Sequence, residues 1–219
     1  MTYELGILGG MGTFATTVFF ERLYNLTKAK KDQDHINALI LNHATMPDRT
    51  EAILKGGEKF LEAVRGDFEI FNRAKVKYIV IPCNTSHYFI DEMEKMAEAE
   101  IINMPYETVK FAKEKGKDLM LFATAGTVKG KVYEKYAREL QIPLHYPTEA
   151  EEKIIMDTIY KVKETGNLNY PEFQKLIDKY KDKYTLIMGC TELSLLDYGD
   201  SVDAMDVLIK KTLEKCGKL

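Results

Sequence analysis

Short apolar runs alternate with longer amphipathic segments along most of the chain. Runs such as Leu5–Leu8 carry no charged residue, which is typical of strands buried on both faces of a parallel sheet. Segments such as Glu58–Ala74 repeat apolar residues at a helical spacing. The predicted strands are Leu5–Leu8, Ala38–Asn42, Tyr78–Ile81, Glu100–Asn103, Leu119–Phe122, Leu144–Tyr146 and Leu186–Met188, and the predicted helices include Phe14–Lys28, Glu58–Ala74, Lys131–Leu140, Glu149–Lys163 and Ala204–Cys216.

This alternation of strands and helices predicts an α/β fold in which helices cover both faces of parallel sheets. The chain has 219 residues, enough for two small α/β domains with cores of their own. Length and pattern together leave open one continuous sheet or two separate ones.

An internal repeat favours two sheets. The segment ELGILGGMGT at Glu4–Thr13 aligns with DLMLFATAGT at Asp118–Thr127, and YIVIPCNT at Tyr78–Thr85 aligns with YTLIMGCT at Tyr184–Thr191. Two matches in the same order predict two similar Rossmann-like or flavodoxin-like halves related by pseudo-two-fold symmetry, although chance similarity between buried strands is an alternative. We expect residues 1–104 and 204–219 to form the first domain and residues 105–203 the second.

Two of the three cysteines, Cys83 and Cys190, follow matching strands of the repeat. Ligands of open parallel sheets bind beyond the carboxyl ends of the strands, so we expect both thiols in one cleft between the halves. Each is followed by residues that favour a helix start, and a helix N-terminus would lower the pKa of a thiol. The alternative is that both are inert buried cysteines.

Two facing thiols suit the inversion of a stereocentre. A base on one face removes the Cα proton, and an acid on the other face returns one. Nucleophilic catalysis by a single cysteine is a competing use, and His87 lies four residues after Cys83 as a possible base.

Composition restricts the partners. The formal net charge is -3 and no basic stripe is present, so we expect a small-molecule substrate or other copies of the chain and no nucleic acid. The sequence has no signal peptide, no membrane-spanning apolar run and no disulfide framework, which predicts a cytoplasmic protein with no membrane partner.

The four histidines are scattered, so no metal site is expected. Gly10–Ala15 fits a dinucleotide fingerprint, but the second strand ends in Asn42-His43 without the expected acid.

Five ordered motifs resemble the aspartate/glutamate racemase family, and the aspartate racemases within it most closely. The motifs are GILGGMG at Gly6–Gly12, DQDHI at Asp32–Ile36, MPDRT at Met46–Thr50, PCNTSHYF at Pro82–Phe89 and GCTEL at Gly189–Leu193.

The resemblance implies a two-domain enzyme, commonly a homodimer, that racemises aspartate without pyridoxal phosphate or another cofactor. It implies that Cys83 and Cys190 are the two acid/base groups and that Arg49 pairs with the side-chain carboxylate of the substrate. The other substrate-binding residues that it implies are Met11, Asn84, Thr85, Thr127, Lys163 and Thr191.

Three alternatives stay open on the same cleft. The substrate could be glutamate or a broader set of amino acids. The reaction could be isomerisation or decarboxylation of a small diacid, which can depend on one cysteine. The protein could also bind small carboxylates without turning them over.

Overall fold

The computed structural model describes residues 3–165, 167–196 and 199–219. Its first half contains a four-stranded parallel sheet with the strand order β2-β1-β3-β4. The central strand β1 is buried along its whole length, whereas β2 at the edge is only half-buried. The strands are β1 (Leu5–Gly9), β2 (Ala38–Asn42), β3 (Tyr78–Val80) and β4 (Glu100–Ile101).

The second half repeats this arrangement with the strand order β6-β5-β7-β8, and all described pairs are parallel. The sequence repeat therefore has a structural basis, since β5 occupies the place of β1 and β7 that of β3. The prediction of an α/β fold with two similar halves is confirmed. The strands are β5 (Leu119–Ala123), β6 (Leu144–His145), β7 (Thr185–Gly189) and β8 (Val202–Asp203).

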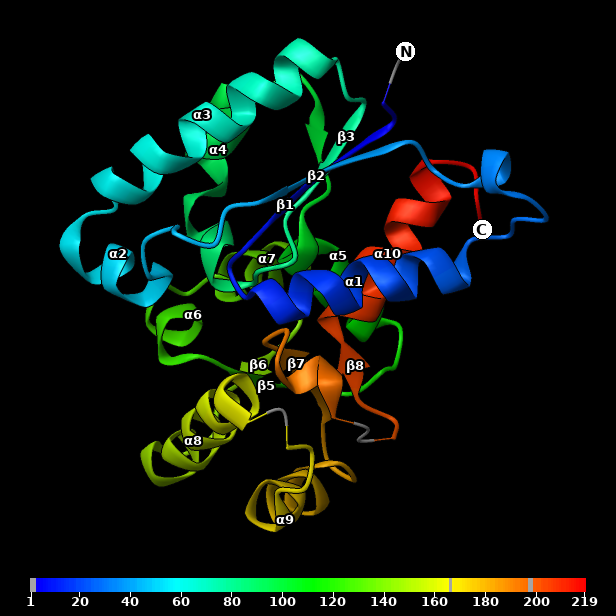
Figure 1. Cartoon of the computed structure of the whole chain (residues 1–219). Coiled ribbons are helices and arrows are strands. Elements are labelled where there is room, and N and C mark those ends of the chain that lie inside the picture. The colour runs from blue at the N-terminus through cyan, green and yellow to red at the C-terminus, as the bar shows by residue number, and fades with distance from the viewer. Residues whose placement is uncertain (1–2, 166, 197–198) are drawn as a thin grey trace.

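Helices cover both faces of the first sheet (Figure 1). One face packs against α1 and α10 through side chains that include Phe19 and Leu208. The other face packs against α3 and its neighbours through Phe60, Phe68 and Phe71. These helices are α1 (Thr13–Leu26), α2 (Arg49–Lys55), α3 (Glu58–Ala74), α4 (Ile90–Met96) and α10 (Ala204–Lys215).

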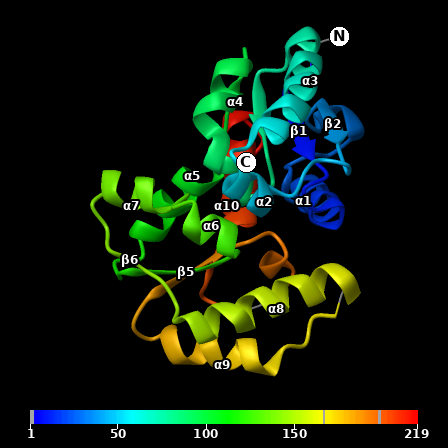
Figure 2. The same cartoon turned by 90° about the vertical axis from the view of Figure 1, so that its left-hand side faces the viewer.

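The second sheet is covered in the same way. The helices α8 and α9 lie side by side on one face (Figure 2), where Ile159 and Phe173 enter the core. Val109 of α5 and Tyr136 of α7 pack on the other face. These helices are α5 (Met104–Lys113), α6 (Ala125–Lys129), α7 (Glu134–Glu139), α8 (Glu149–Thr165) and α9 (Pro171–Tyr180).

Most predicted elements are present, with differences at their ends. The helix expected over Lys131–Leu140 begins three residues later, because Lys131 has a φ of 53° and interrupts the helical path. The strand expected over Glu100–Asn103 stops at Ile101, because the Asn103 side chain accepts a hydrogen bond from the Tyr106 amide and caps α5.

The domain boundaries at residues 104 and 204 stay predictions. The helix α10, which follows the second sheet, contributes Met205 and Leu208 to the core of the first half. No helix within the described ranges is both long enough and apolar enough to cross a membrane.

Candidate active site

A small cavity of about 40 Å³ lies between the two halves and has both thiols in its wall. Cys83 belongs to the first half and Cys190 to the second, and each is 6% exposed. The cavity has room for only a few water molecules, so the cleft must widen to admit an amino acid. The lining residues are Met11, Asp48, Arg49, Thr50, Cys83, Asn84, Thr85, Thr124, Met156, Ile159, Tyr160, Lys163, Cys190, Thr191 and Glu192.

Cys83 lies in a tight turn beyond the end of β3. The carbonyl oxygen of this residue accepts two hydrogen bonds at 2.8 Å, from the Ser86 hydroxyl and from Nδ1 of His87. A short 3-10 helix over Thr85–Phe89 follows. These bonds fix the turn that presents the thiol to the cavity.

Cys190 lies at the corresponding position beyond β7, also before a short 3-10 helix, Leu193–Leu195. The thiol of Cys190 donates a hydrogen bond to Oε2 of Glu192, with Sγ and Oε2 2.9 Å apart. Glu192 is 4% exposed, so the thiol and the carboxylate share one buried site.

The predicted lowering of the thiol pKa is wrong for Cys190. Burial and the neighbouring Glu192 carboxylate raise the pKa of Cys190 well above its ordinary value, and Lys163 only partly offsets them. The helix after Cys190 is a single 3-10 turn, too short for the dipole that the prediction assumed.

Asn84 presents an unused donor at the cavity. The Tyr133 hydroxyl donates a hydrogen bond to Oδ1 of Asn84, and Nδ2 of Asn84 is buried with no partner in the structure. Asn84 is 3% exposed and lines the cavity. A buried donor without a partner is costly, so this amide is suited to a carboxylate or carbonyl oxygen of a ligand.

Three threonine hydroxyls form a cluster beside Asn84. Thr85 Oγ1 lies 3.0 Å from Oγ1 of both Thr124 and Thr127. Thr85 and Thr124 line the cavity, whereas Thr127 is fully buried outside its lining. The structure thus places Thr127 where it supports the cavity wall from behind.

Arg49 is the first residue of α2 and reaches the first glycine loop. The guanidinium donates hydrogen bonds to the Pro47 carbonyl at 3.0 Å and to the Met11 carbonyl at 3.4 Å. Arg49 and Met11 both line the cavity. The guanidinium is oriented by backbone oxygens and has no carboxylate partner in the described residues, so its charge is available to an anion.

Lys163 projects from α8 into the same cavity. The ammonium Nζ lies 3.4 Å from Oε1 of Glu192, and 37% of the Lys163 side chain is exposed. Burial lowers the pKa of Lys163, but the negative charges of Glu192 and of the two cysteines in their thiolate forms outweigh it and raise the pKa overall. The predicted residues Met11, Arg49, Asn84, Thr85, Lys163 and Thr191 therefore meet at one cavity with both cysteines.

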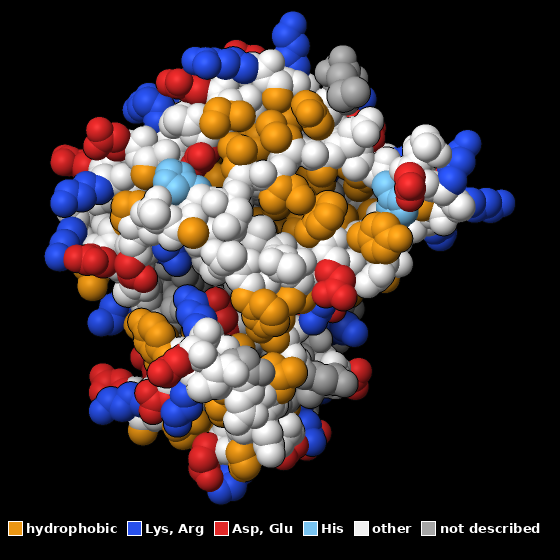
Figure 3. All heavy atoms as spheres, in the orientation of Figure 1, with side chains coloured by type: hydrophobic (Ala, Val, Ile, Leu, Met, Phe, Trp, Pro, Cys, Tyr) orange, Lys and Arg blue, Asp and Glu red, His pale blue; other side chains and the backbone are white. Residues whose placement is uncertain are grey.

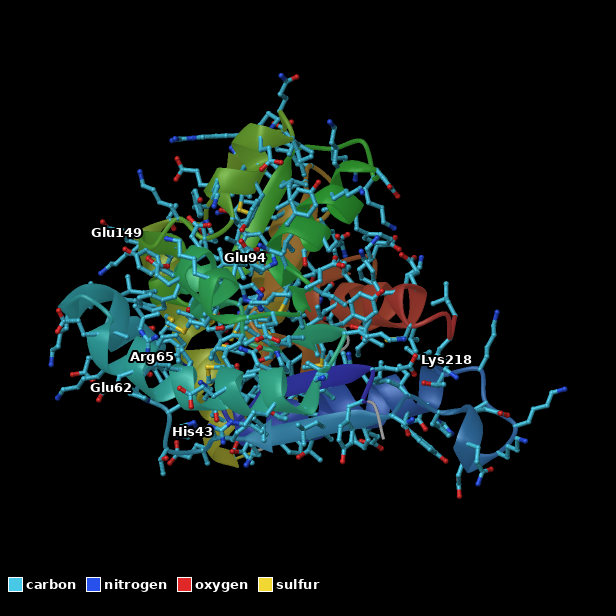
Figure 4. The ribbon with its side chains drawn as sticks, turned by 90° about the horizontal axis from the view of Figure 1, so that it is seen from above. His43, Glu62, Arg65, Glu94, Glu149 and Lys218 are labelled. Atoms are coloured by element: carbon cyan, nitrogen blue, oxygen red, sulfur yellow. The ribbon has the colours of Figure 1, made fainter. Side chains whose placement is uncertain are left out.

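His43 and His87 take structural positions. His87 is 2% exposed and bonds to the Cys83 carbonyl through Nδ1 and to the Met104 amide through Nε2. Both ring nitrogens are occupied, so His87 is not a base for the Cys83 thiol. His43 pairs with Asp67 at 2.8 Å and lies at the edge of the molecule beyond β2 (Figure 4). Neither histidine lines the cavity.

Sequence reasoning missed Glu192 and Tyr133. Glu192 stands in the quoted GCTEL motif two residues after the thiol, and that spacing could have marked it as a partner of Cys190. Tyr133 comes from another element, and no local pattern connects it with Asn84.

A wider hollow of about 650 Å³ lies at the other end of the second sheet, around Thr185 and Leu186 at the start of β7. Its wall combines three lysines and two aspartates with uncharged residues, and neither Cys83 nor Cys190 contributes to it. We therefore assign the chemistry to the small cavity. Within the described ranges, no group of three or more His, Cys, Asp or Glu side chains could hold a metal ion.

Two matched α/β halves with a thiol from each at one cavity define the class of the two-lobed racemases. Residues 8–212 match the Asp/Glu/hydantoin racemase family, and the chain belongs to it. The broad-specificity amino-acid racemase RacX of Bacillus subtilis is 22% identical over 95% of this chain and 96% of its own.

Two solved structures are similar over almost the whole chain. An aspartate racemase from Picrophilus torridus is 26% identical, with a TM-score of 0.87, over 99% of this chain and 95% of its own. An aspartate racemase homologue from Pyrococcus horikoshii is 20% identical, with a TM-score of 0.80, over 99% of this chain and all of its own.

Proposed function

We propose that this amino-acid racemase interconverts L- and D-aspartate through two thiols and without a cofactor. The observation that carries the proposal is the cavity between the halves, which has one cysteine from each matched strand end in its wall. One thiolate removes the Cα proton from one face of the substrate. The opposite thiol then donates a proton to the other face and completes the inversion.

The guanidinium of Arg49 supports an acidic substrate. Two cations, Arg49 and Lys163, and two carboxylates, Asp48 and Glu192, line the cavity. Glu192 pairs with Lys163 at 3.4 Å, and Asp48 is exposed and caps α2, so Arg49 is the cation that has no carboxylate partner among the described residues. The guanidinium of Arg49 would bind the side-chain carboxylate through two parallel hydrogen bonds. Nδ2 of Asn84 would donate to the α-carboxylate, and its hydrogen bond would strengthen as charge develops there after the Cα proton leaves.

The likeness to the aspartate racemase of Picrophilus torridus supports aspartate over glutamate as the substrate.

A panel of amino acids tests the substrate. L-Aspartate, L-glutamate, L-alanine and L-lysine are incubated separately with the protein without pyridoxal phosphate, and the enantiomers are separated by chiral chromatography. We expect D-aspartate to form with the highest kcat/KM, by about tenfold or more. Faster turnover of glutamate would mean that glutamate and not aspartate is the substrate. Equal turnover of aspartate and alanine would refute recognition of the acidic side chain.

Arg49→Ala gives the matching test of the site. Loss of a charge-assisted pair of hydrogen bonds, worth about 3 kcal/mol, should lower kcat/KM for aspartate by about a hundredfold. Arg65 on α3 (Figure 4) is exposed and is not among the residues that line the cavity, so Arg65→Ala serves as the control and should leave kcat/KM unchanged. An equal loss in both variants would argue against a specific role of Arg49.

We also propose that the enzyme is a homodimer, as the family resemblance implies, and that it is cytoplasmic, as the sequence features predict. Exposed apolar side chains support self-association, among them Phe20 and Tyr24 of α1 and Ile40 of the edge strand β2. Figure 3 displays apolar side chains gathered on this face of the first half. Light scattering at several protein concentrations should give twice the chain mass of 25.1 kDa, and a single-chain mass throughout would refute the dimer.

A further inference from the structure

The two thiols have different neighbours at matching positions. The residue two places after Cys83 is Thr85, whose hydroxyl bonds to two other threonines. The residue two places after Cys190 is Glu192, whose carboxylate accepts the thiol hydrogen bond at 2.9 Å. The pseudo-symmetric fold therefore carries an asymmetric pair of acid/base groups.

Both halves of the molecule hold the Glu192 carboxylate. Oε1 lies 3.4 Å from Nζ of Lys163 on α8 in the second half. On the side of the first half, a Cβ atom at Gly12 would lie 2.8 Å from Oε1, so the glycine loop packs closely against the carboxylate. The Thr191 hydroxyl lies 3.4 Å from Oε2. The side chain is thus fixed where it meets the thiol.

These contacts determine the charge around Cys190. The titratable and charged groups that line the cavity with its thiol are Glu192 on its own loop, Lys163 and Tyr160 on α8, Asp48 and Arg49 at the start of α2, and Cys83 after β3. Tyr133 before α7 also interacts with Cys190. Burial and Glu192 act in the same direction and raise the pKa of Cys190, whereas Lys163 opposes them. A thiolate at this position would lie beside a second buried anion.

We propose that Glu192 is a positioning residue that holds Cys190 as the protonated acid in the free enzyme, so that Cys83 acts first as the base. The inference rests on the proposed two-thiol reaction. With one enantiomer, the Cys83 thiolate takes the Cα proton, and the Cys190 thiol gives its proton to the opposite face of the same carbon. The product state has a Cys83 thiol and a Cys190 thiolate, and exchange of protons with water restores the free enzyme.

The other enantiomer requires the reverse proton arrangement, which Glu192 makes rare in the free enzyme. A ligand that binds only a minor form has its apparent affinity reduced by the population of that form. That enantiomer should therefore have the higher KM. Because the equilibrium constant of a racemisation is one, its kcat must be higher by the same factor.

Thiol alkylation tests the protonation of Cys190 without any substrate. Cys83→Ser with Cys216→Ser leaves Cys190 as the single thiol, and its rate of reaction with iodoacetamide is followed against pH by mass spectrometry. Adding Glu192→Gln should lower the midpoint by about one pH unit or more, so that the thiolate fraction below the midpoint rises about tenfold. Glu164→Gln removes an exposed carboxylate beside Lys163 that does not line the cavity, and it should not move the midpoint.

An unchanged midpoint with Glu192→Gln would overturn the inference. If that variant does not fold, Glu192→Asp withdraws the carboxylate from the thiol and should give a smaller shift in the same direction. A kinetic experiment compares KM for the two enantiomers, and Glu192→Gln should reduce the difference between the two KM values. Absence of aspartate turnover would overturn the proposed function, whereas the alkylation result would still decide the role of Glu192.

Discussion

The burial of His87 predicts how the free energy of unfolding depends on pH. The imidazole is 2% exposed and connects the Cys83 carbonyl to the Met104 amide, at 2.8 Å and 3.3 Å. Nε2 accepts a hydrogen bond from the Met104 amide, so the ring must be neutral in the folded protein. Burial lowers the pKa of His87 from 6.5 to about 4.

The sign of the effect follows from proton binding. The folded-state pKa lies below the unfolded one, so between pH 6.5 and 4 the unfolded chain binds more protons and acid favours unfolding. The contribution of neutral His87 is complete above pH 6.5. It falls by about 2 kcal/mol at pH 5 and by about 3 kcal/mol near pH 4.

His87→Asn isolates this contribution. Asparagine keeps a donor for the Cys83 carbonyl, does not titrate in this range and leaves the Met104 amide without its acceptor, which costs about 1–3 kcal/mol at pH 7.5. The penalty should shrink by about 2 kcal/mol between pH 7.5 and pH 5, because only the wild type loses stability through this group. Urea unfolding of both proteins at fixed protein concentration measures it.

The contributions of the carboxylates to the free energy of unfolding are the same in both proteins, so they cancel in this comparison. A penalty that is constant with pH to within about 0.5 kcal/mol would refute the reasoning, since it would mean that His87 has the same pKa in the folded and unfolded states.

The remaining predictions concern the glycine loop and the cavity wall. Gly10→Ala should destabilise the fold by about 2 kcal/mol or more in urea unfolding, because Gly10 has a φ of 91° and a Cβ atom there would lie 2.4 Å from the His43 carbonyl carbon. Gly66→Ala on the open face of α3, where a Cβ atom meets nothing within 4 Å, should instead stabilise by about 0.5–1 kcal/mol, and equal effects would contradict both statements. Tyr133→Phe removes the donor to Oδ1 of Asn84 and should lower kcat/KM for aspartate about tenfold, whereas unchanged kinetics would refute its role in orienting the amide.

Sequence alone was sufficient for the central strands. Leu5–Leu8 and Leu119–Phe122 are uncharged runs because β1 and β5 are buried on both faces. The edges were less predictable: β8 is a two-residue strand that only its pairing with β7 defines. A pattern read along the chain detects burial, but it cannot detect a pairing this short.

The sequence predicted those residues of the candidate site that belong to a recognisable motif. Cys83 and Cys190 stand at matching strand ends in the sequence, and the structure places both at one cavity. The electrostatics were not predictable, because the pKa of Cys190 depends on Lys163, a residue of another element, and on the orientation of the Glu192 side chain. The contact between Tyr133 and Asn84 spans 49 residues and has no local signature.

Proton exchange in the single-cysteine variants tests the central claim most directly. Cys83→Ser and Cys190→Ser are each incubated in D₂O with L-aspartate and separately with D-aspartate, under reducing conditions, and the Cα–H signal is followed by NMR. The two-thiol account predicts that neither variant racemises aspartate and that each exchanges the Cα proton of one enantiomer only, with opposite preferences. Racemisation by either variant, or exchange of the same enantiomer by both, would contradict it.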